Sequence, residues 1–227
     1  MTRAILIIAK APVAGLAKTR LAPRFGPRGA ARLAAAALID TVTAALRVPH
    51  TEVIVSYTGD LTGAERADEL GSLLSRCVTI GQRGGGFGAR LANAHSDAAA
   101  MGFDRVLQIG MDTPQITATN LDEALNRLDP DAPRCVLGDA ADGGWWAFGT
   151  TGARGAAALA TVPMSQPDTG RRTRAALRRS GLRVDDLATM TDVDLPGDVD
   201  DVARLCAPDS EFVRAVTALA PATTVLR

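Results

Sequence analysis

Hydrophobic and polar positions follow one another along the chain in two kinds of block. Residues 4–9 read Ala-Ile-Leu-Ile-Ile-Ala and end at Lys10, which is the pattern of a strand that is covered on both faces. Residues 28–47 instead space their apolar side chains, among them Leu33 and Val42, close to a helical period. The chain is therefore predicted to begin with a buried strand, a loop and a long helix.

The same two patterns continue over most of the chain. They predict further strands at residues 52–57, 77–80, 104–109, 134–137 and 145–148, and further helices at 64–74, 89–101, 121–128, 153–160, 171–180 and 198–206. Strands that alternate with helices indicate an α/β fold with a mostly parallel sheet and helices on both faces. Because no linker, repeat or low-complexity segment divides it, we interpret residues 1–227 as a single domain.

Composition argues against several classes of protein. The 25 basic and 25 acidic side chains cancel, whereas nucleic-acid-binding domains usually carry a basic excess, so we expect no nucleic-acid partner. No apolar run approaches the roughly 20 residues that cross a bilayer, and we expect no membrane contact and a cytoplasmic location. Three widely separated cysteines argue against a disulfide scaffold or a zinc site. The oligomeric state stays open.

The first candidate site is the loop that follows the first predicted strand. It holds the only two lysines of the chain, Lys10 and Lys18, together with Gly15 and Arg20. Free backbone N–H groups and cationic side chains are suited to a phosphate chain, and this edge of an open α/β sheet is where ligands bind. The loop is not a Walker A motif, because an alanine and not a glycine precedes Lys18. A solvated basic loop is the alternative.

A glycine-rich turn at residues 82–88 leads into the helix predicted at 89–101. Residues 84–89 fit the G-x-G-x-x-A pattern of dinucleotide-binding proteins. They follow the third predicted strand and not the first, so we reject that interpretation. Two other roles for this turn stay open: it contacts a different ligand, or it is only a flexible start of the helix.

Carboxylates form the next candidate group. Asp112 follows the strand at 104–109, while Asp192 and Asp194 lie two positions apart in an extended segment and therefore on one side of it. Such carboxylates can hold Mg²⁺ against phosphate oxygens. The alternative for Asp112 is a helix cap. We interpret the nearby Asp198 as part of the acidic first turn of the last predicted helix.

A short motif at residues 142–146 reads Asp-Gly-Gly-Trp-Trp. Its glycines let the backbone approach a ligand, and its tryptophans offer stacking surface. Neighbouring residues of a strand point to opposite faces, so at most one of Trp145 and Trp146 is expected to face a cleft. A hairpin with core tryptophans is the alternative.

Four of these motifs, at residues 10–21, 110–114, 142–145 and 192–194, together resemble a bacterial glycosyltransferase-A-like family, the radical-SAM/selenodomain-associated transferase 1 proteins. That family is related to 2-phospholactate guanylyltransferase and, more remotely, to molybdenum cofactor guanylyltransferase. The resemblance covers roughly residues 3–205. It implies a single-domain nucleotide-diphospho-sugar transferase fold.

The resemblance also implies roles for single residues. Lys18 and Arg20 would contact the nucleotide phosphates, Asp112 and Asp194 would surround a divalent metal (Mg²⁺ or Mn²⁺), and the turn from Gln82 to Gly88 would lie near the base. The chain departs from the family pattern at Met111, where serine is expected, at the two tryptophans, where tyrosines are usual, and at residues 163–165, where an aromatic residue commonly follows the proline. These departures concern the acceptor pocket.

We interpret the chain as a metal-dependent nucleotidyltransferase, in which an acceptor phosphate or similar oxyanion attacks the α-phosphorus of an NTP and pyrophosphate leaves. The partners are thus a nucleotide and a small-molecule acceptor. The predicted catalytic residues are Lys18, Arg20 and Asp112, and the predicted metal ligands are Asp112 and Asp194. The predicted nucleotide-binding residues are Lys10, Gly15, Lys18, Thr19, Arg20, Gln82 and Gly88, and the predicted acceptor-binding residues are Asp142, Gly143, Gly144 and Trp145. The alternatives are glycosyl transfer from an NDP-sugar and nucleotide binding without turnover.

Overall fold

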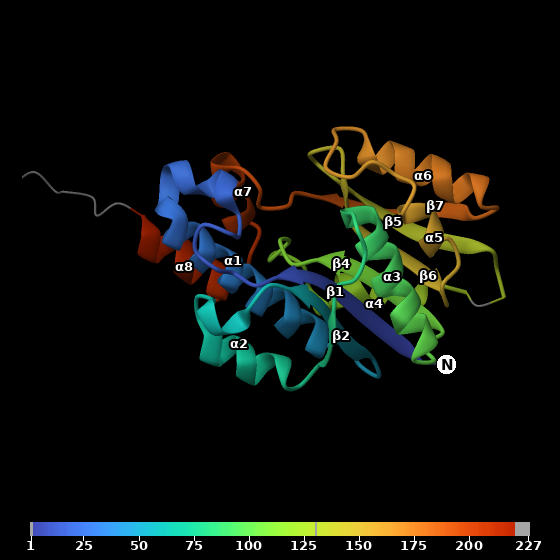
Figure 1. Ribbon diagram of the computed structural model, residues 1–227, viewed down its shortest axis with the longest axis horizontal. Coiled ribbons are helices and arrows are strands. Elements are labelled where there is room, and N and C mark those ends of the chain that lie inside the picture. Colours follow the sequence, from blue (N-terminus) through green and yellow to red (C-terminus); the bar gives the residue numbers. More distant parts are fainter. Residues whose placement is uncertain (1, 130, 221–227) are drawn as a thin grey trace, which may run out of the picture.

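The computed structural model describes residues 2–129 and 131–220, and seven strands of this part form one sheet (Figure 1). Residues 1, 130 and 221–227 of the predicted domain lie outside the described residues. The strand order is β3-β2-β1-β4-β6-β5-β7. The strands are β1 (Arg3–Lys10), β2 (Glu52–Thr58), β3 (Val78–Gly81), β4 (Arg105–Gly110), β5 (Arg134–Ala140), β6 (Trp145–Thr151) and β7 (Arg183–Met190).

The sheet is mostly parallel, as the alternation of strands and helices predicts. β1, β2, β3 and β4 pair in parallel, and so do β5 and β7. β6 runs antiparallel to both of its neighbours, β4 and β5. The connection from β5 to β6 spans only residues 141–144, which is too short for a parallel crossover and closes a hairpin instead. The predicted fold class is confirmed.

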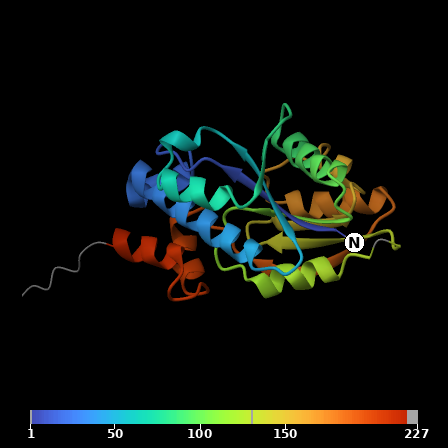
Figure 2. The ribbon, with the colours of Figure 1, turned by 90° about the horizontal axis from the view of Figure 1, so that it is seen from below.

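Helices cover both faces of this sheet (Figures 1 and 2). They are α1 (Ala22–Leu46), α2 (Ala67–Leu74), α3 (Phe87–Ala100), α4 (Ala118–Asn126), α5 (Ala156–Leu159), α6 (Thr169–Arg179), α7 (Pro196–Ala203) and α8 (Glu211–Leu219), with short 3-10 turns η1 (Thr19–Leu21) and η2 (Leu61–Gly63). Residues of α1, α2 and α4 share one core with Ile5 and Ile7 of β1, and residues of α3, α5 and α6 share another with Ala4 and Leu6. The two-residue period of the strand thus divides β1 between two cores.

The long helix α1 has a kink at its start. Gly26 has φ 70° and ψ 165°, outside the helical region, and Pro27 follows it. The helix predicted at 28–47 therefore corresponds to the part beyond the kink. By length and composition the stretch Thr19–Leu46 could cross a membrane, but 78% of its most apolar window is buried in the protein. Such burial is typical of a core helix.

The helix α8 was not predicted from the sequence, and it packs against α1. Asp40 of α1 accepts hydrogen bonds from the backbone N–H groups of Glu211 (3.0 Å) and Phe212 (2.8 Å) at the start of α8. The Phe212 side chain is fully buried in a third core beside Leu33 and Val199. The carboxylate of Asp40 thus binds the first N–H groups of a helix far away in the sequence.

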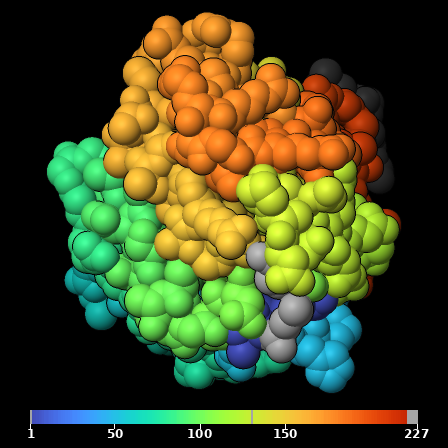
Figure 3. Space-filling view, turned by 90° about the vertical axis from the view of Figure 1, so that its right-hand side faces the viewer, coloured from blue at the N-terminus to red at the C-terminus, as the bar shows by residue number. Residues whose placement is uncertain are grey.

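The space-filling view shows the face of the molecule at which β1 begins, and α6, in orange, crosses its upper part (Figure 3). The candidate site lies at the other edge, where β1 and β4 end.

Candidate functional site

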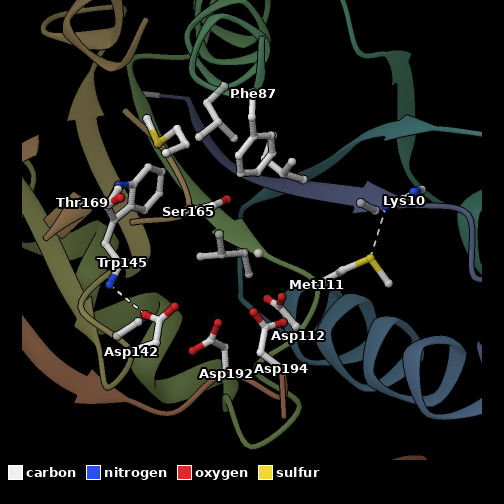
Figure 4. Close-up of a pocket in the computed structure, with 18 of the residues that line it drawn as sticks. Lys10, Phe87, Met111, Asp112, Asp142, Trp145, Ser165, Thr169, Asp192 and Asp194 are labelled. Atoms are coloured by element: carbon white, nitrogen blue, oxygen red, sulfur yellow. Dashed lines mark hydrogen bonds between the residues drawn. The ribbon is translucent and has the colours of Figure 1, made fainter. Parts of the chain in front are cut away.

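A cavity of about 640 Å³ opens at the carboxyl ends of β1 and β4 (Figure 4). One part of its wall, here the lysine side, consists of Lys10, Lys18, Arg20, Asp112 and Asp194. The opposite part, here the hairpin side, consists of Asp142, Gly144, Trp145, Ser165 and Thr169. Residues that are distant in sequence meet here because parallel strands end at a common edge.

Lys18 links the first strand's loop to two carboxylates. Its Nζ donates to Asp112 Oδ2 at 2.7 Å and to Asp194 Oδ1 at 2.5 Å, and only 14% of its side chain is exposed. Burial by itself would lower the pKa of Lys18, but the charges of Asp112 and Asp194 outweigh it and raise the pKa above its usual value. The ammonium group of Lys18 therefore stays protonated between the two carboxylates.

The two other cations of the lysine side are less constrained. Arg20 approaches Asp194 Oδ2 at 3.5 Å and keeps 66% of its side chain exposed. Lys10 makes no ion pair within the described residues, and its backbone N–H points to the sulfur of Met111 at 3.2 Å (Figure 4). Both side chains are thus available to an anion that enters the cavity.

Three carboxylates gather beside these cations. Ligand oxygens of Asp112, Asp192 and Asp194 lie within 4.8 Å of one another (Figure 4). The segment after β7 is held against the segment after β4 by a hydrogen bond from the Val193 N–H to the Asp112 carbonyl, at 2.9 Å. Burial, followed by the charges of Asp112, Asp142 and Asp194, raises the pKa of Asp192 to about 7. Asp192, which is not one of the two predicted metal ligands Asp112 and Asp194, is part of this cluster.

The local structure around Asp112 excludes its alternative role as the cap of the next helix. That helix, α4, begins at Ala118 and not at residue 121, and Thr117 caps it by accepting from Asn120 N at 3.2 Å. Asp112 instead packs over Gly110, where a methyl group would come within 2.5 Å of Asp112 Oδ1. The glycine makes room for the carboxylate.

Asp198 orients the third segment of the cluster. Its Oδ2 accepts from the backbone N–H groups of Asp194 (3.0 Å) and Leu195 (2.6 Å) at the start of α7. The prediction that Asp198 lies in the acidic first turn of this helix is confirmed, although α7 begins at Pro196. Its capping bonds also fix the backbone that carries the Asp194 side chain.

On the hairpin side, the two tryptophans separate as predicted. Trp145 lines the cavity, while Trp146 is buried and donates from Nε1 to the carbonyl of Ala188 at 2.9 Å. Asp142 accepts from the Gly144 N–H at 2.7 Å (Figure 4), and it makes no ion pair within residues 2–129 and 131–220. One aromatic face and one unpaired carboxylate therefore border this part of the cavity.

Gly143 does not line the cavity. Its φ is 88°, and a Cβ there would lie 1.9 Å from the carbonyl oxygen of Pro167. Its own carbonyl accepts from the Gly170 N–H at 2.8 Å. We expected this glycine to let the backbone approach a ligand, but the close neighbour is the protein's own segment 163–169.

Three residues predicted to bind the nucleotide, Gly15, Thr19 and Gly88, also lie outside the cavity wall. Gly88 is buried, and a Cβ there would come within 2.5 Å of the Leu159 carbonyl. Gln82 does line the cavity, and its Nε2 donates to the carbonyls of Ala9 (2.9 Å) and Ser56 (3.0 Å). Its amide thus joins the ends of β1 and β2 and leaves its oxygen as the group that can face a ligand.

The segment between α5 and α6 and the first residue of α6 supply wall residues that were not predicted as site residues. Ser165 has φ 58°, which is unusual for a residue with a side chain, and its hydroxyl points toward the middle of the cavity (Figure 4). Thr169 Oγ1 fixes this turn by donating to the Pro163 carbonyl (3.0 Å) and accepting from the Gln166 N–H (3.0 Å). Only the departure after Pro163 marked this segment in the sequence.

The fold, with its charged cavity at the carboxyl edge of the sheet, defines the glycosyltransferase-A-like class of nucleotide-diphospho-sugar transferases. Within it, the chain belongs to the family described as "Uncharacterized protein conserved in bacteria (DUF2064)", whose profile matches residues 41–166.

Comparison with known proteins gives three further likenesses. A "putative nucleotide-diphospho-sugar transferase" structure from Desulfovibrio desulfuricans G20 has a TM-score of 0.79 and 26% identity over 96% of this chain and 97% of that one. A nucleotidyl transferase from Methanothermobacter has a TM-score of 0.58 and 15% identity, over 94% and 99%, a likeness of fold alone. The phosphoenolpyruvate guanylyltransferase of Mycolicibacterium vanbaalenii is 43% identical over 58 residues, which cover 26% of this chain and 27% of that protein. This chain thus matches about a quarter of that curated relative's length.

Proposed function

We propose that this protein is a nucleotidyltransferase that moves an NMP group from an NTP to a small phosphorylated or other oxyanion acceptor and releases pyrophosphate. The observation that carries the proposal is the meeting of Lys18 and Arg20 with Asp112 and Asp194 in one cavity. A triphosphate needs cations for its charge, and carboxylates near it need a further cation between them. The likeness to a guanylyltransferase and to a nucleotide-diphospho-sugar transferase supports this reading.

The donor set of the acidic cluster fits a hard divalent cation. Its members offer only carboxylate oxygens, and these lie within 4.8 Å of one another. Mg²⁺ and Mn²⁺ prefer such ligands, together with phosphate oxygens and water. Asp112, Asp192 and Asp194 would hold the ion, which when bound supplies charge neutralisation to the phosphates.

In the proposed reaction, an acceptor oxygen forms a bond to the α-phosphorus. The bond between this phosphorus and the α,β-bridging oxygen breaks, and that oxygen leaves with pyrophosphate. Arg20 and Lys10 would bind the pyrophosphate as its charge increases, because neither is fully committed to a carboxylate. Asp142 and Trp145 would orient the acceptor from the hairpin side. Catalysis then consists mainly of alignment and electrostatic stabilisation. We place this NTP-dependent reaction in the cytoplasm.

The hairpin side favours a second candidate function, glycosyl transfer from an NDP-sugar. An aromatic face beside an unpaired carboxylate, as in Trp145 and Asp142, is suited to a sugar ring and its hydroxyls. The sheet and the cavity are compatible with either reaction, since fold does not decide function.

A panel assay separates these candidates. The protein is incubated with Mg²⁺ or Mn²⁺, each of the four NTPs, and small phosphorylated acids that include phosphoenolpyruvate and 2-phospholactate, and pyrophosphate is measured. Release of pyrophosphate that depends on the acceptor and is lost in Asp194→Asn supports the proposal. Release of NDP from NDP-sugars supports the second candidate, and nucleotide binding without either product contradicts both.

A further inference from the structure

Lys18 takes the position between two of the proposed metal ligands. Its Nζ lies 2.7 Å from Asp112 Oδ2 and 2.5 Å from Asp194 Oδ1. Magnesium binds oxygen at about 2.0–2.1 Å, so an ion shared by these two oxygens would overlap the ammonium group. The ammonium and such an ion therefore exclude one another by size as well as by charge.

The second oxygen of each carboxylate has a neighbour of its own. Asp112 Oδ1 packs over the Cα of Gly110, and Asp194 Oδ2 faces Arg20 at 3.5 Å. A dication that binds the pair must therefore compete with Lys18 or with Arg20. Within the described residues Asp192 makes no ion pair, so one carboxylate of the cluster lacks a cation.

The backbone around Lys18 is held by packing, so an exchange of partners has to come from rotation of the side chain. The flanking Ala17 and Leu21 are buried in different cores, at 5% and 0% exposure, and hold the loop on both sides. The lysine stem has four carbons and can turn the ammonium from the carboxylates into the cavity that it already lines. A polyphosphate in that cavity would offer it new anionic partners.

We infer that Lys18 is an exchangeable counter-ion of the carboxylate cluster: it holds Asp112 and Asp194 in the absence of substrate and leaves them for the phosphates when metal and nucleotide bind together. This inference rests on the proposed function. Before substrate binds, Lys18 would therefore suppress binding of the free metal ion. The metal is then taken up as a complex with the nucleotide, which limits occupation of the site by metal alone.

Metal binding without turnover tests the inference. Mn²⁺ binding is measured by the loss of the free-ion EPR signal, with and without GTP whose α,β-bridging oxygen is replaced by methylene. We expect Lys18→Met to bind Mn²⁺ about tenfold or more tightly than the wild type when nucleotide is absent. Added nucleotide analogue should raise the Mn²⁺ affinity of the wild type far more than that of the variant. Lys18→Gln serves as a second variant.

Arg24→Met is the matched control. It removes one positive charge from α1, where Arg24 pairs with Asp200 at 2.8 Å and donates to the Pro196 carbonyl at 2.9 Å, and within the described residues Arg24 makes no ion pair with the three-carboxylate cluster. Its Mn²⁺ affinity should equal that of the wild type. A similar gain in both variants would mean that net charge and not the position of Lys18 is responsible, and would overturn the inference.

Because the chain has only Lys10 and Lys18, wild-type protein labelled with ¹³C at lysine Cε gives two lysine signals. The signal assigned to Lys18 should shift when Mg²⁺ and the analogue are added together and stay in place with Mg²⁺ alone. Equal Mn²⁺ affinity in wild type and Lys18→Met, or an unmoved Lys18 signal in the ternary complex, overturns the inference and leaves the proposed function standing. Absence of Mn²⁺ binding in every protein, with nucleotide present, instead contradicts the proposed metal site itself.

Discussion

The two sides of the cavity use polar groups in opposite ways. On the lysine side, cations and carboxylates are paired with one another, as Lys18 is with Asp112 and Asp194. On the hairpin side, Asp142 makes no ion pair within the described residues, and close packing around Gly143 fixes the shape of the wall. Under the proposed function, the lysine side would bind a polyanion through its charges, while the hairpin side would select the acceptor by shape and hydrogen bonding.

Loss of a carboxylate on the lysine side should have the largest effect. Asp194→Asn and Asp112→Asn each remove one anionic oxygen ligand and one partner of Lys18, so we expect pyrophosphate release to fall by roughly 100-fold or more. Steady-state rates at saturating Mg²⁺ check this. Asp200→Asn, which alters an exposed ion pair outside the cavity, should keep its rate. Equal rates in Asp112→Asn and wild type would show that Asp112 has only a structural role.

On the hairpin side, close packing should contribute more to stability than charge does. The variant Gly143→Ala tests this expectation. A Cβ at Gly143 would meet the Pro167 carbonyl at 1.9 Å, with φ at 88°. We expect the free energy of unfolding to fall by about 1–3 kcal/mol, as measured by denaturant titration. Gly15→Ala is the matched control, because Gly15 has a similar φ of 77° but nothing within 4 Å of the added carbon. If both variants lose the same amount of stability, backbone strain at positive φ and not the contact with Pro167 accounts for the loss.

A buried histidine packs against strand β6, and its titration should change the free energy of unfolding. His95 of α3 packs against Phe148 at a ring distance of 5.1 Å, and burial lowers its pKa to about 4. The folded protein thus disfavours the charged imidazolium. The stability that the neutral His95 contributes is therefore fully present above about pH 6.5, and it is lost as the pH falls toward 4. The loss should reach about 2–3 kcal/mol. Unfolding titrations between pH 7 and 4 should show a weaker pH dependence for His95→Leu than for the wild type.

Arg20→Ala should produce the smallest effect. Two thirds of this side chain is exposed, so we expect unchanged stability and a weakening of NTP affinity by about tenfold, the value of one charge-assisted hydrogen bond. Isothermal titration with a non-hydrolysable NTP measures it. Arg20→Lys should recover only part of the affinity if both guanidinium branches contact phosphate. Unchanged affinity in Arg20→Ala would remove Arg20 from the proposed site.

The sequence predicted the central features of the fold because they depend on local patterns. The apolar run at 4–9 and the helical spacing at 28–47 each reflect burial of the element's own side chains. The meeting of Lys18, Asp112 and Asp194 also followed, since carboxyl ends of parallel strands share an edge.

Other features depend on contacts between distant segments and leave no local signal. The start of α8 is held by Asp40, 171 residues away in the sequence. The need for glycine at 143 comes from Pro167, which only the fold brings near. Gln82 was predicted to bind the nucleotide, yet its side-chain amide nitrogen donates hydrogen bonds to two strand carbonyls of the protein itself. Such roles are set by tertiary packing, which periodicity and spacing do not encode.

The hydrogen bond from Val193 to the Asp112 carbonyl has a consequence for the order of assembly during synthesis. Lys18 and Asp112 leave the ribosome well before Asp194, which lies 82 positions after Asp112. A nascent chain that already contains β1 to β6 lacks the final carboxylates, because Asp192 and Asp194 follow β7 in the sequence. The cavity thus gains its full charge only after β7 has paired with β5, so partly made chains lack the complete carboxylate set.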